Sequence, residues 1–150
     1  MVGTDLRQQL RNYIQSSHEQ GILDETFDRV KNLESDGNPQ FLSEIFSMFC
    51  HDAENGIAEL ARFLDEPVID YENVSAFAHQ LKGSSSSVGG NRMVLACCEL
   101  RQACSNKTKE GCFEAFDKVK REYCILRDNL NFIAQMEKTI LTNEARRRSQ

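Results

Sequence analysis

The residues from His79 to Gly90 hold the densest group of potentially reactive side chains in the chain. The stretch reads His79-Gln80-Leu81-Lys82-Gly83, followed by four serines, a valine and two glycines. Near neutral pH an imidazole can act as a nucleophile, a base or a metal ligand, and a nearby ammonium can offset negative charge. The function therefore depends on whether this stretch is a phosphate-binding loop, a metal site, a linker or a helix with a reactive imidazole.

The spacing of these residues argues against several kinds of site. The pattern G-x-x-x-x-G-K-[ST] of a nucleotide-binding loop does not occur, and Lys82 precedes the serine run. His79 has no metal-binding side chain one turn later, and Ser75 stands one turn earlier, so a helical metal pair is absent. No hydrolase motif is present. A surface histidine followed by a serine-rich linker remains an open alternative.

A helix over residues ~70–89 would place His79 on its solvent side. At 100° per residue, one face collects the residues Val74, Phe77, Ala78, Leu81, Ser85 and Val88. The imidazole lies about 140° from the centre of this face. Its neighbours on that side are small residues, namely Ser75, Ala76, Gly83, Ser86 and Gly90. Lys82 and Glu72 lie at the edges of this group.

Gly83 is unfavourable for helix formation, because glycine inside a helix lowers its stability by about 1 kcal/mol relative to alanine. The serines weaken helix propensity further. Such conflicts are typical of functional sites. Small side chains let another protein approach closely, and Lys82 can offset incoming negative charge. These features suit an imidazole that accepts a phosphoryl group from a docked protein. His18 and His51 lack this surround, and we expect them to be ordinary surface or boundary residues.

The remaining apolar residues predict further helices, with no alternating strand pattern. We expect helices over residues ~4–20, from the cap Asp24 to about Leu33, over ~39–65, over ~92–105 with Asn91 as cap, and from near Glu110 to about Leu141. A break is predicted at Ser35–Pro39. In the last helix Cys112, Phe116, Val119, Tyr123, Leu126, Leu130 and Ile133 follow at steps of 4, 3, 4, 3, 4 and 3. This spacing is typical of a helix packed along a bundle.

The short connections predict an all-α fold, an antiparallel up-down four-helix bundle with two additional N-terminal helices. The 150 residues suit one domain. Within residues 1–150 we expect N-terminal helices at about 4–35, the bundle at about 39–142 and a basic tail at 143–150. The arginines Arg146–Arg148 are most simply a solvated helix end, although they would also suit a nuclear signal.

Composition excludes several classes of protein. A net charge of -5 argues against nucleic-acid binding, and no apolar run is long enough to span a membrane. The N-terminus lacks a signal-peptide core, so we expect the protein to stay inside the cell. Six cysteines without C-x-x-C spacing are best interpreted as reduced, mostly buried residues. If one is redox-sensitive, Cys98 is the predicted exposed thiol.

The stretch His79-Gln80-Leu81-Lys82-Gly83-Ser84-Ser85-Ser86-Ser87-Val88-Gly89 resembles the signature of plant histidine-containing phosphotransfer proteins of the cytokinin type. Similar segments recur at Gly21–Asp24, Asn38–Phe41 and around Glu122-Tyr123, so the resemblance covers nearly the whole chain. Val88 and Gly90 stand where Ile and Ala are common in that family, and the arginine-rich tail has no match in its pattern.

The resemblance implies a phosphorelay carrier rather than an enzyme with its own ATP site. His79 would accept a phosphoryl group from a receiver aspartate of a hybrid sensor kinase and pass it to the receiver of a response regulator. Lys82 would stabilise the phosphoryl charge, and Gln80 and Gly83 would shape a docking surface. The receiver would supply Mg²⁺, so no cofactor or metal is expected in this chain.

The family resemblance also implies shuttling between cytoplasm and nucleus. A carrier with one site is expected to be a monomer. The alternative is a helical adaptor that docks receiver domains without being phosphorylated. Such a pseudo-member would lack the histidine, which is present here at position 79.

Overall fold

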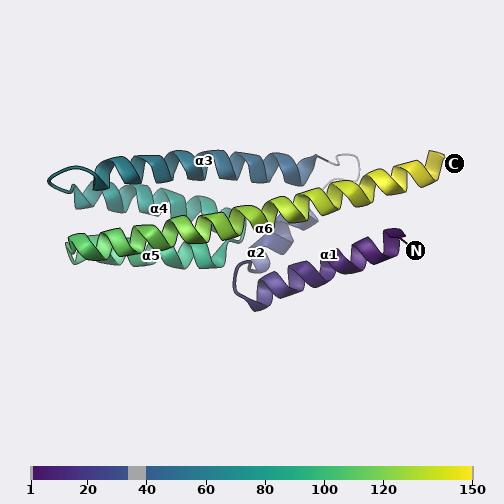
Figure 1. Cartoon of the computed structure of the whole chain (residues 1–150), viewed down its shortest axis with the longest axis horizontal. Coiled ribbons are helices and arrows are strands. Elements are labelled where there is room, and N and C mark those ends of the chain that lie inside the picture. Colours follow the sequence, from purple (N-terminus) through teal and green to yellow (C-terminus); the bar gives the residue numbers. More distant parts are fainter. Residues whose placement is uncertain (1, 34–39, 150) are drawn as a thin grey trace.

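The computed structural model describes residues 2–33 and 40–149, and the described chain is helical throughout its regular elements. The six helices, coloured along the chain in Figure 1, are α1 (Val2–Glu19), α2 (Glu25–Asn32), α3 (Phe41–Leu64), α4 (Tyr71–Ser87), α5 (Asn91–Ser105) and α6 (Lys109–Ser149). Their order agrees with the sequence prediction, and so do their approximate bounds, except at the C-terminal end of α6. The predicted break at Ser35–Pro39 lies outside the described residues.

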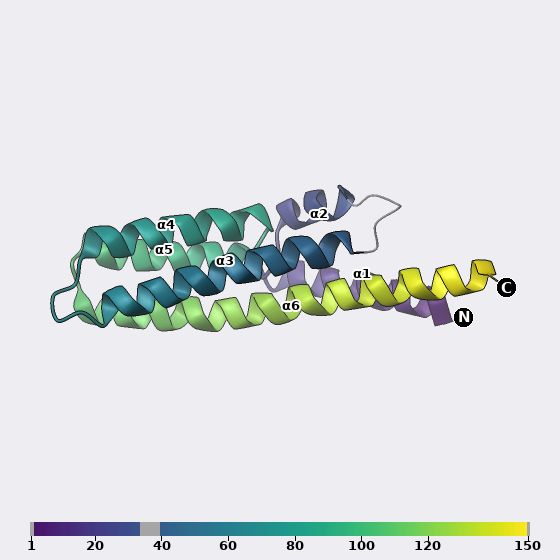
Figure 2. The same ribbon diagram turned by 90° about the horizontal axis from the view of Figure 1, so that it is seen from above.

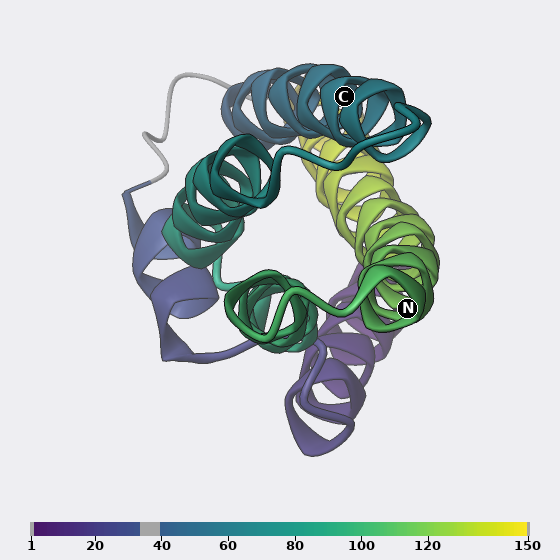
Figure 3. The ribbon, with the colours of Figure 1, turned by 90° about the vertical axis from the view of Figure 1, so that its left-hand side faces the viewer.

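Helices α3 to α6 form a four-helix bundle, which confirms the predicted architecture. The view along the bundle shows α3, α4, α5 and α6 arranged in a ring in chain order (Figure 3). Helix α4 therefore lies between α3 and α5, and α6 closes the ring against α3. Short connections such as Asp65–Asp70 force successive helices to run in opposite directions.

The long helix α6 supplies one wall of the core from Cys112 to Ile140. All seven residues of its predicted apolar repeat are buried, from Cys112 to Ile133. The helix continues to Ser149 rather than ending near Leu141. Its 41 residues correspond to about 60 Å, so it extends well beyond α4 and α5, as Figure 2 shows. The arginines Arg146–Arg148 are exposed in its last turn.

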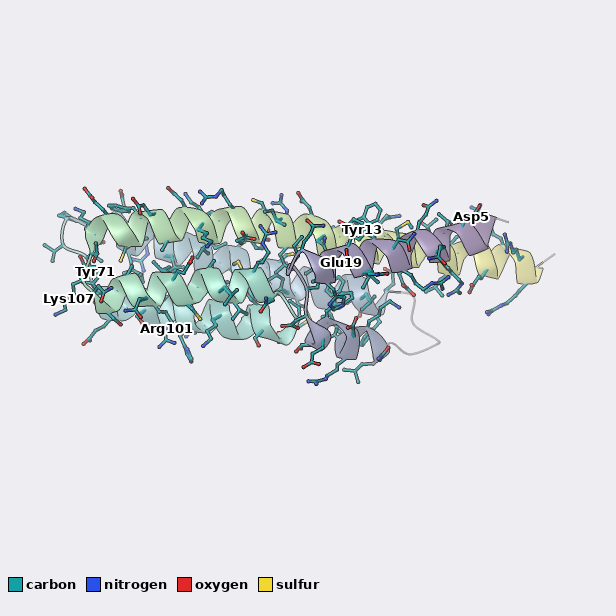
Figure 4. The ribbon with its side chains drawn as sticks, turned by 90° about the horizontal axis from the view of Figure 1, so that it is seen from below. Asp5, Tyr13, Glu19, Tyr71, Arg101 and Lys107 are labelled. Carbon is teal, nitrogen blue, oxygen red and sulfur yellow. The ribbon has the colours of Figure 1, made fainter. Side chains whose placement is uncertain are left out.

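The N-terminal helix α1 packs antiparallel on the part of α6 that extends beyond α5. Buried Asn129 donates from Nδ2 to Ser17 Oγ at 2.9 Å and to the Tyr13 hydroxyl at 3.2 Å. Ser17 in turn donates to the carbonyl oxygen of Tyr13 at 2.9 Å. Tyr13 also lies against Phe132 with ring centroids 4.2 Å apart, and Figure 4 shows it on the side of α1 that faces α6.

The end of α2 and the start of α5 depend on local contacts. Leu33, at the predicted end of α2, follows the last helical residue and is 72% exposed. Asn91 was expected to cap α5, but it is the first helical residue, and Gly90 occupies the cap position. A Cβ on Gly90 would lie 2.5 Å from Leu126 Cδ2, so packing against α6 determines which residue stands there.

The six cysteines are unlinked, and half of them are buried: Cys97, Cys104 and Cys112. Cys104 and Cys112 place their sulfur atoms 3.8 Å apart. The prediction that Cys98 would be the more exposed thiol is wrong. Cys98 is half-buried between α4 and α5, whereas Cys124 is exposed on the outer face of α6.

Candidate functional site

Helix α4 carries His79 and is anchored at both ends. At its start, the side chain of Asp70 accepts a hydrogen bond of 3.1 Å from the backbone N–H of Asn73. Such a cap satisfies one of the free amide groups of a helix N-terminus. The inner face of the helix buries Val74, Ala78, Leu81 and Ser85, and Val88 at the C-cap is buried as well, so five of the six residues predicted there are buried. Phe77 is half-buried and lies against Phe63 of α3.

Two glycines end this helix in a defined geometry. Gly89 has φ +78°, and its N–H donates to the Ser86 carbonyl at 3.1 Å. The N–H of Gly90 donates to the Ser85 carbonyl at 2.9 Å. This pair of bonds is the Schellman motif, which requires a left-handed residue at the Gly89 position. Gly90 was predicted on the open face near the histidine, but it is buried beyond the helix end.

The serine run is therefore helical rather than a linker. Residues 84–87 all belong to α4. Ser85 is fully buried, and its hydroxyl donates to the Leu81 carbonyl at 2.8 Å. A buried position suits serine only when its hydroxyl has such a partner. This result excludes the alternative of a surface histidine that precedes a flexible linker.

His79 is exposed on the side of α4 opposite the core. The predicted neighbours Ala76, Gly83 and Ser86 are exposed with it. A Cβ on Gly83 would meet no atom within 4 Å beyond the local helix backbone. No packing contact inside the protein therefore requires glycine at this position, and its effect is to leave open space one turn from the imidazole.

Lys82 lies at the border between α4 and α5. Burial raises the pKa of the Cys97 thiol on α5 to about 12, and the nearby positive charge of Lys82 opposes that shift. Among the described residues, Lys82 forms no ion pair. The ammonium one turn after His79 is thus available to an incoming anion.

The remaining predicted residues point to opposite sides of α4. Ser75 faces α5, where its hydroxyl accepts a hydrogen bond of 3.5 Å from Arg101 Nε. Gln80 faces α3 and lines a groove of about 340 Å³ that also contains Asp52 and Ser84. Sequence reasoning missed Arg101 and Asp52, because neither belongs to a motif and their approach to α4 depends on packing between helices.

No helix in the described part of the chain is both long and apolar enough to cross a membrane. Residues 2–33 and 40–149 also contain no group of three or more histidine, cysteine or carboxylate side chains that could hold a metal ion. The other histidines agree with their predicted surface or boundary positions. His18 is half-buried, with Nε2 3.1 Å from Asp28, and His51 is exposed with Asn55 beside its ring.

Comparison with known proteins gives the same family from sequence and from structure. The model of the Hpt domain matches residues 44–139. Histidine-containing phosphotransfer protein 2 of Arabidopsis thaliana is 40% identical over 137 residues, covering 91% of this chain and 88% of the relative. Histidine-containing phosphotransfer protein 2 of Oryza sativa subsp. japonica is 38% identical, covering 93% of this chain and 95% of the relative.

The fold is also similar to the solved structure of a histidine-containing phosphotransfer protein from maize. It superposes with a TM-score of 0.82 at 40% identity, covering 90% of this chain and 99% of that chain. These similarities extend over nearly the whole chain and confirm the resemblance seen in the sequence. The chain belongs to the plant-type histidine-containing phosphotransfer proteins and is a histidine phosphorelay carrier of two-component signalling.

Proposed function

We propose that His79 is the residue that carries the phosphoryl group. The observation that supports this assignment is an exposed imidazole on a helix that is capped at both ends, with open space at Gly83. A neutral ring nitrogen, Nε2 in our proposal, attacks the phosphorus of an aspartyl phosphate, and the N–P bond forms as the P–O bond breaks. The aspartate leaves as a carboxylate. The reverse exchange then transfers the group to a second aspartate and regenerates the imidazole.

The donor and acceptor in this proposal are receiver domains. The donor is the receiver of a hybrid histidine kinase, and the acceptor is the receiver of a response regulator. Lys82 offsets the charge of the phosphoryl group while it lies between the two proteins. Ser75, Ala76, Gln80, Gly83 and Ser86 contribute the surrounding docking surface, because their short or mobile side chains allow close approach.

The carrier supplies a positioned nucleophile, and the partner supplies the rest of the reaction centre. We propose that Mg²⁺ is held by the receiver, that the carrier has no ATP site and turns over once per phosphoryl group, and that it acts as a monomer. We also propose that it works in both cytoplasm and nucleus, since a carrier must meet kinases and regulators in different places.

The test is transfer from a receiver that carries a labelled phosphoryl group to the wild-type chain and to His79→Gln. We expect acid-labile, alkali-stable label on the wild type and none on the variant. His51→Gln provides a matched control, since His51 is also an exposed helical histidine. Circular dichroism should show unchanged helix content in both variants. Label that persists on His79→Gln would refute the assignment, and absence of label on the wild type would favour the adaptor alternative.

A further inference from the structure

His79 lies on a ridge between two grooves of different charge. Helix α4 is flanked by α3 on one side and by α5 on the other (Figure 3). The α4–α5 groove has a volume of about 240 Å³ and is lined by Ser75, Cys98, Arg101, Gln102 and Ser105. The α3–α4 groove is the cavity of about 340 Å³ that contains Asp52 and Gln80.

The α4–α5 groove is basic. Arg101, labelled on α5 in Figure 4, holds its guanidinium beside Ser75 through the 3.5 Å contact. Ser75 lies one turn before His79, a rise of about 6 Å along the helix. Lys82 lies on the same side of α4, near Cys97. Within the described part of the chain, neither cation forms an ion pair, and Glu72, which lines a neighbouring groove, is not paired with them.

The α3–α4 groove is acidic, and most of its net charge comes from one residue. Glu59 lines this groove, but Arg62 lies 2.7 Å from its carboxylate and compensates its charge. Asp52 is exposed and, among residues 2–33 and 40–149, forms no ion pair. It also lines a smaller cavity of about 200 Å³ with Ser84 and Ser87, further along the same side of α4.

We propose that Arg101 and Asp52 are positioning residues that give the surface around His79 an electrical polarity, and that this polarity selects the orientation in which a receiver docks. The inference rests on the proposed function. A receiver that accepts phosphate on an aspartate and binds Mg²⁺ presents carboxylates around its reaction centre. Those carboxylates favour the Arg101 side of the ridge, whereas the reversed orientation would bring them against Asp52.

Orientation matters because phosphoryl transfer requires the attacking nitrogen, the phosphorus and the leaving oxygen to lie roughly in line. A receiver rotated by about half a turn over the same small residues would misplace its aspartate relative to His79. Repulsion between like charges disfavours the reversed orientation, and attraction between unlike charges increases the association rate in the productive one. Both effects weaken with salt, since exposed charges are screened beyond about 8 Å at physiological ionic strength.

The first experiment measures the second-order rate of transfer from a phosphorylated receiver to charge-reversed chains. At low salt we expect about a tenfold loss for Arg101→Glu and for Asp52→Lys, and a smaller loss at high salt. Arg101→Lys should retain most of the rate, and Arg101→Gln should be intermediate. This order follows the charge at position 101, whereas a purely structural role would depend on the shape of the side chain.

Two residues on α6 provide matched controls. Arg121 and Glu114 are exposed on a helix that does not border either groove. Arg121→Glu and Glu114→Lys reproduce the same changes in net charge. We expect smaller rate changes than in the groove variants at low salt, and rates within about twofold of wild type at physiological salt, where distant exposed charges are screened. Equal losses in the control and groove variants would overturn the proposal, because net charge alone would then explain the effect.

The second experiment reads the orientation directly. A spin label placed beside the reaction centre of the receiver should broaden amide resonances of the wild-type chain mainly along one of the two grooves. The Asp52→Lys/Arg101→Glu double variant should lose or invert this preference. An unchanged broadening pattern would overturn the proposal. Failure of the proposed function is a separate outcome, since it would appear as label retained on His79→Gln, whatever the behaviour of the charge variants.

Discussion

The carbonyl oxygen of Gly89 accepts a hydrogen bond of 2.9 Å from the backbone N–H of Asp24. This bond joins the end of the histidine-bearing helix to the start of α2, two segments far apart in the sequence. Asp24 also caps α2 by accepting from the Thr26 N–H at 2.9 Å. A single turn thus ends α4 and joins the start of α2 to the bundle.

Gly89→Ala should destabilise the protein by at least about 2 kcal/mol, because two penalties combine. The residue has φ +78°, and an added Cβ would lie 2.4 Å from the backbone nitrogen of Phe27. Urea unfolding followed by circular dichroism measures the loss. A change below about 0.5 kcal/mol would show that the turn relaxes without cost.

Gly83→Ala should have the opposite effect on stability. The added methyl group meets open space, and alanine improves helix propensity, so we expect a gain of up to about 1 kcal/mol. Transfer to His79 should nevertheless become slower, because the methyl group occupies space needed by the docked partner. Urea unfolding tests the predicted gain in stability, and transfer kinetics on the same variant test the predicted loss of rate. A variant that is more stable and equally fast would remove the functional explanation for this glycine.

Lys82→Ala should slow phosphoryl transfer by about 10- to 100-fold, because it removes the ammonium one turn after His79 on the same helix. The helix should remain intact, since alanine is a good helix former and Lys82 is only half-buried. Lys82→Arg should recover part of the rate by restoring the charge. Rapid-quench kinetics with one receiver provide the measurement, and equal rates for all three chains would exclude the electrostatic role.

Asn129→Ala should cost about 1–3 kcal/mol, because it removes the side-chain amide that donates to the hydroxyls of Ser17 and Tyr13. The loss should be localised to the contact between α1 and α6. Hydrogen exchange should therefore increase first in α1, while amides of α4 and α5 remain protected. Uniform loss of protection over the whole chain would show instead that α1 unfolds together with the bundle.

Stability should fall as pH rises above about 9, because buried thiols and Tyr123 keep their protons only in the folded state. Burial raises the pKa of Cys97 and of Cys104 to about 12. Burial also raises the pKa of Tyr123, and its hydrogen bond to Glu54 adds to this shift. Above pH 9 the unfolded chain loses these protons first, so the folded state binds more protons and its free energy of unfolding decreases.

Each such group contributes at most about 1.4 kcal/mol per pH unit between its unfolded and folded pKa values. Urea unfolding from pH 7 to pH 11 measures the slope. Cys97→Ala should reduce the slope, because it removes one of the buried thiols whose pKa is raised. Equal slopes in the wild type and Cys97→Ala would contradict the assignment.

Much of this protein follows from local patterns in its sequence. The repeat from Cys112 to Ile133 predicted the buried face of α6, and the period of Val74, Ala78, Leu81 and Ser85 placed His79 on the outside of α4. Both results follow from the constant angle between residues of a helix, which depends only on short-range geometry. The specific stretch around His79 also identified the family before any structural comparison.

The tertiary structure decided the features that depend on contacts between helices. Gly90 rather than Asn91 caps α5 because Leu126 of α6 leaves no space for a side chain. The polarity around His79 arises because packing brings Arg101 of α5 and Asp52 of α3 to opposite sides of α4. These residues are far apart in the chain, and helical period alone gives no information about which faces of different helices meet. The sequence therefore determined the proposed nucleophile and the helix that presents it, whereas packing determined the charges that surround it.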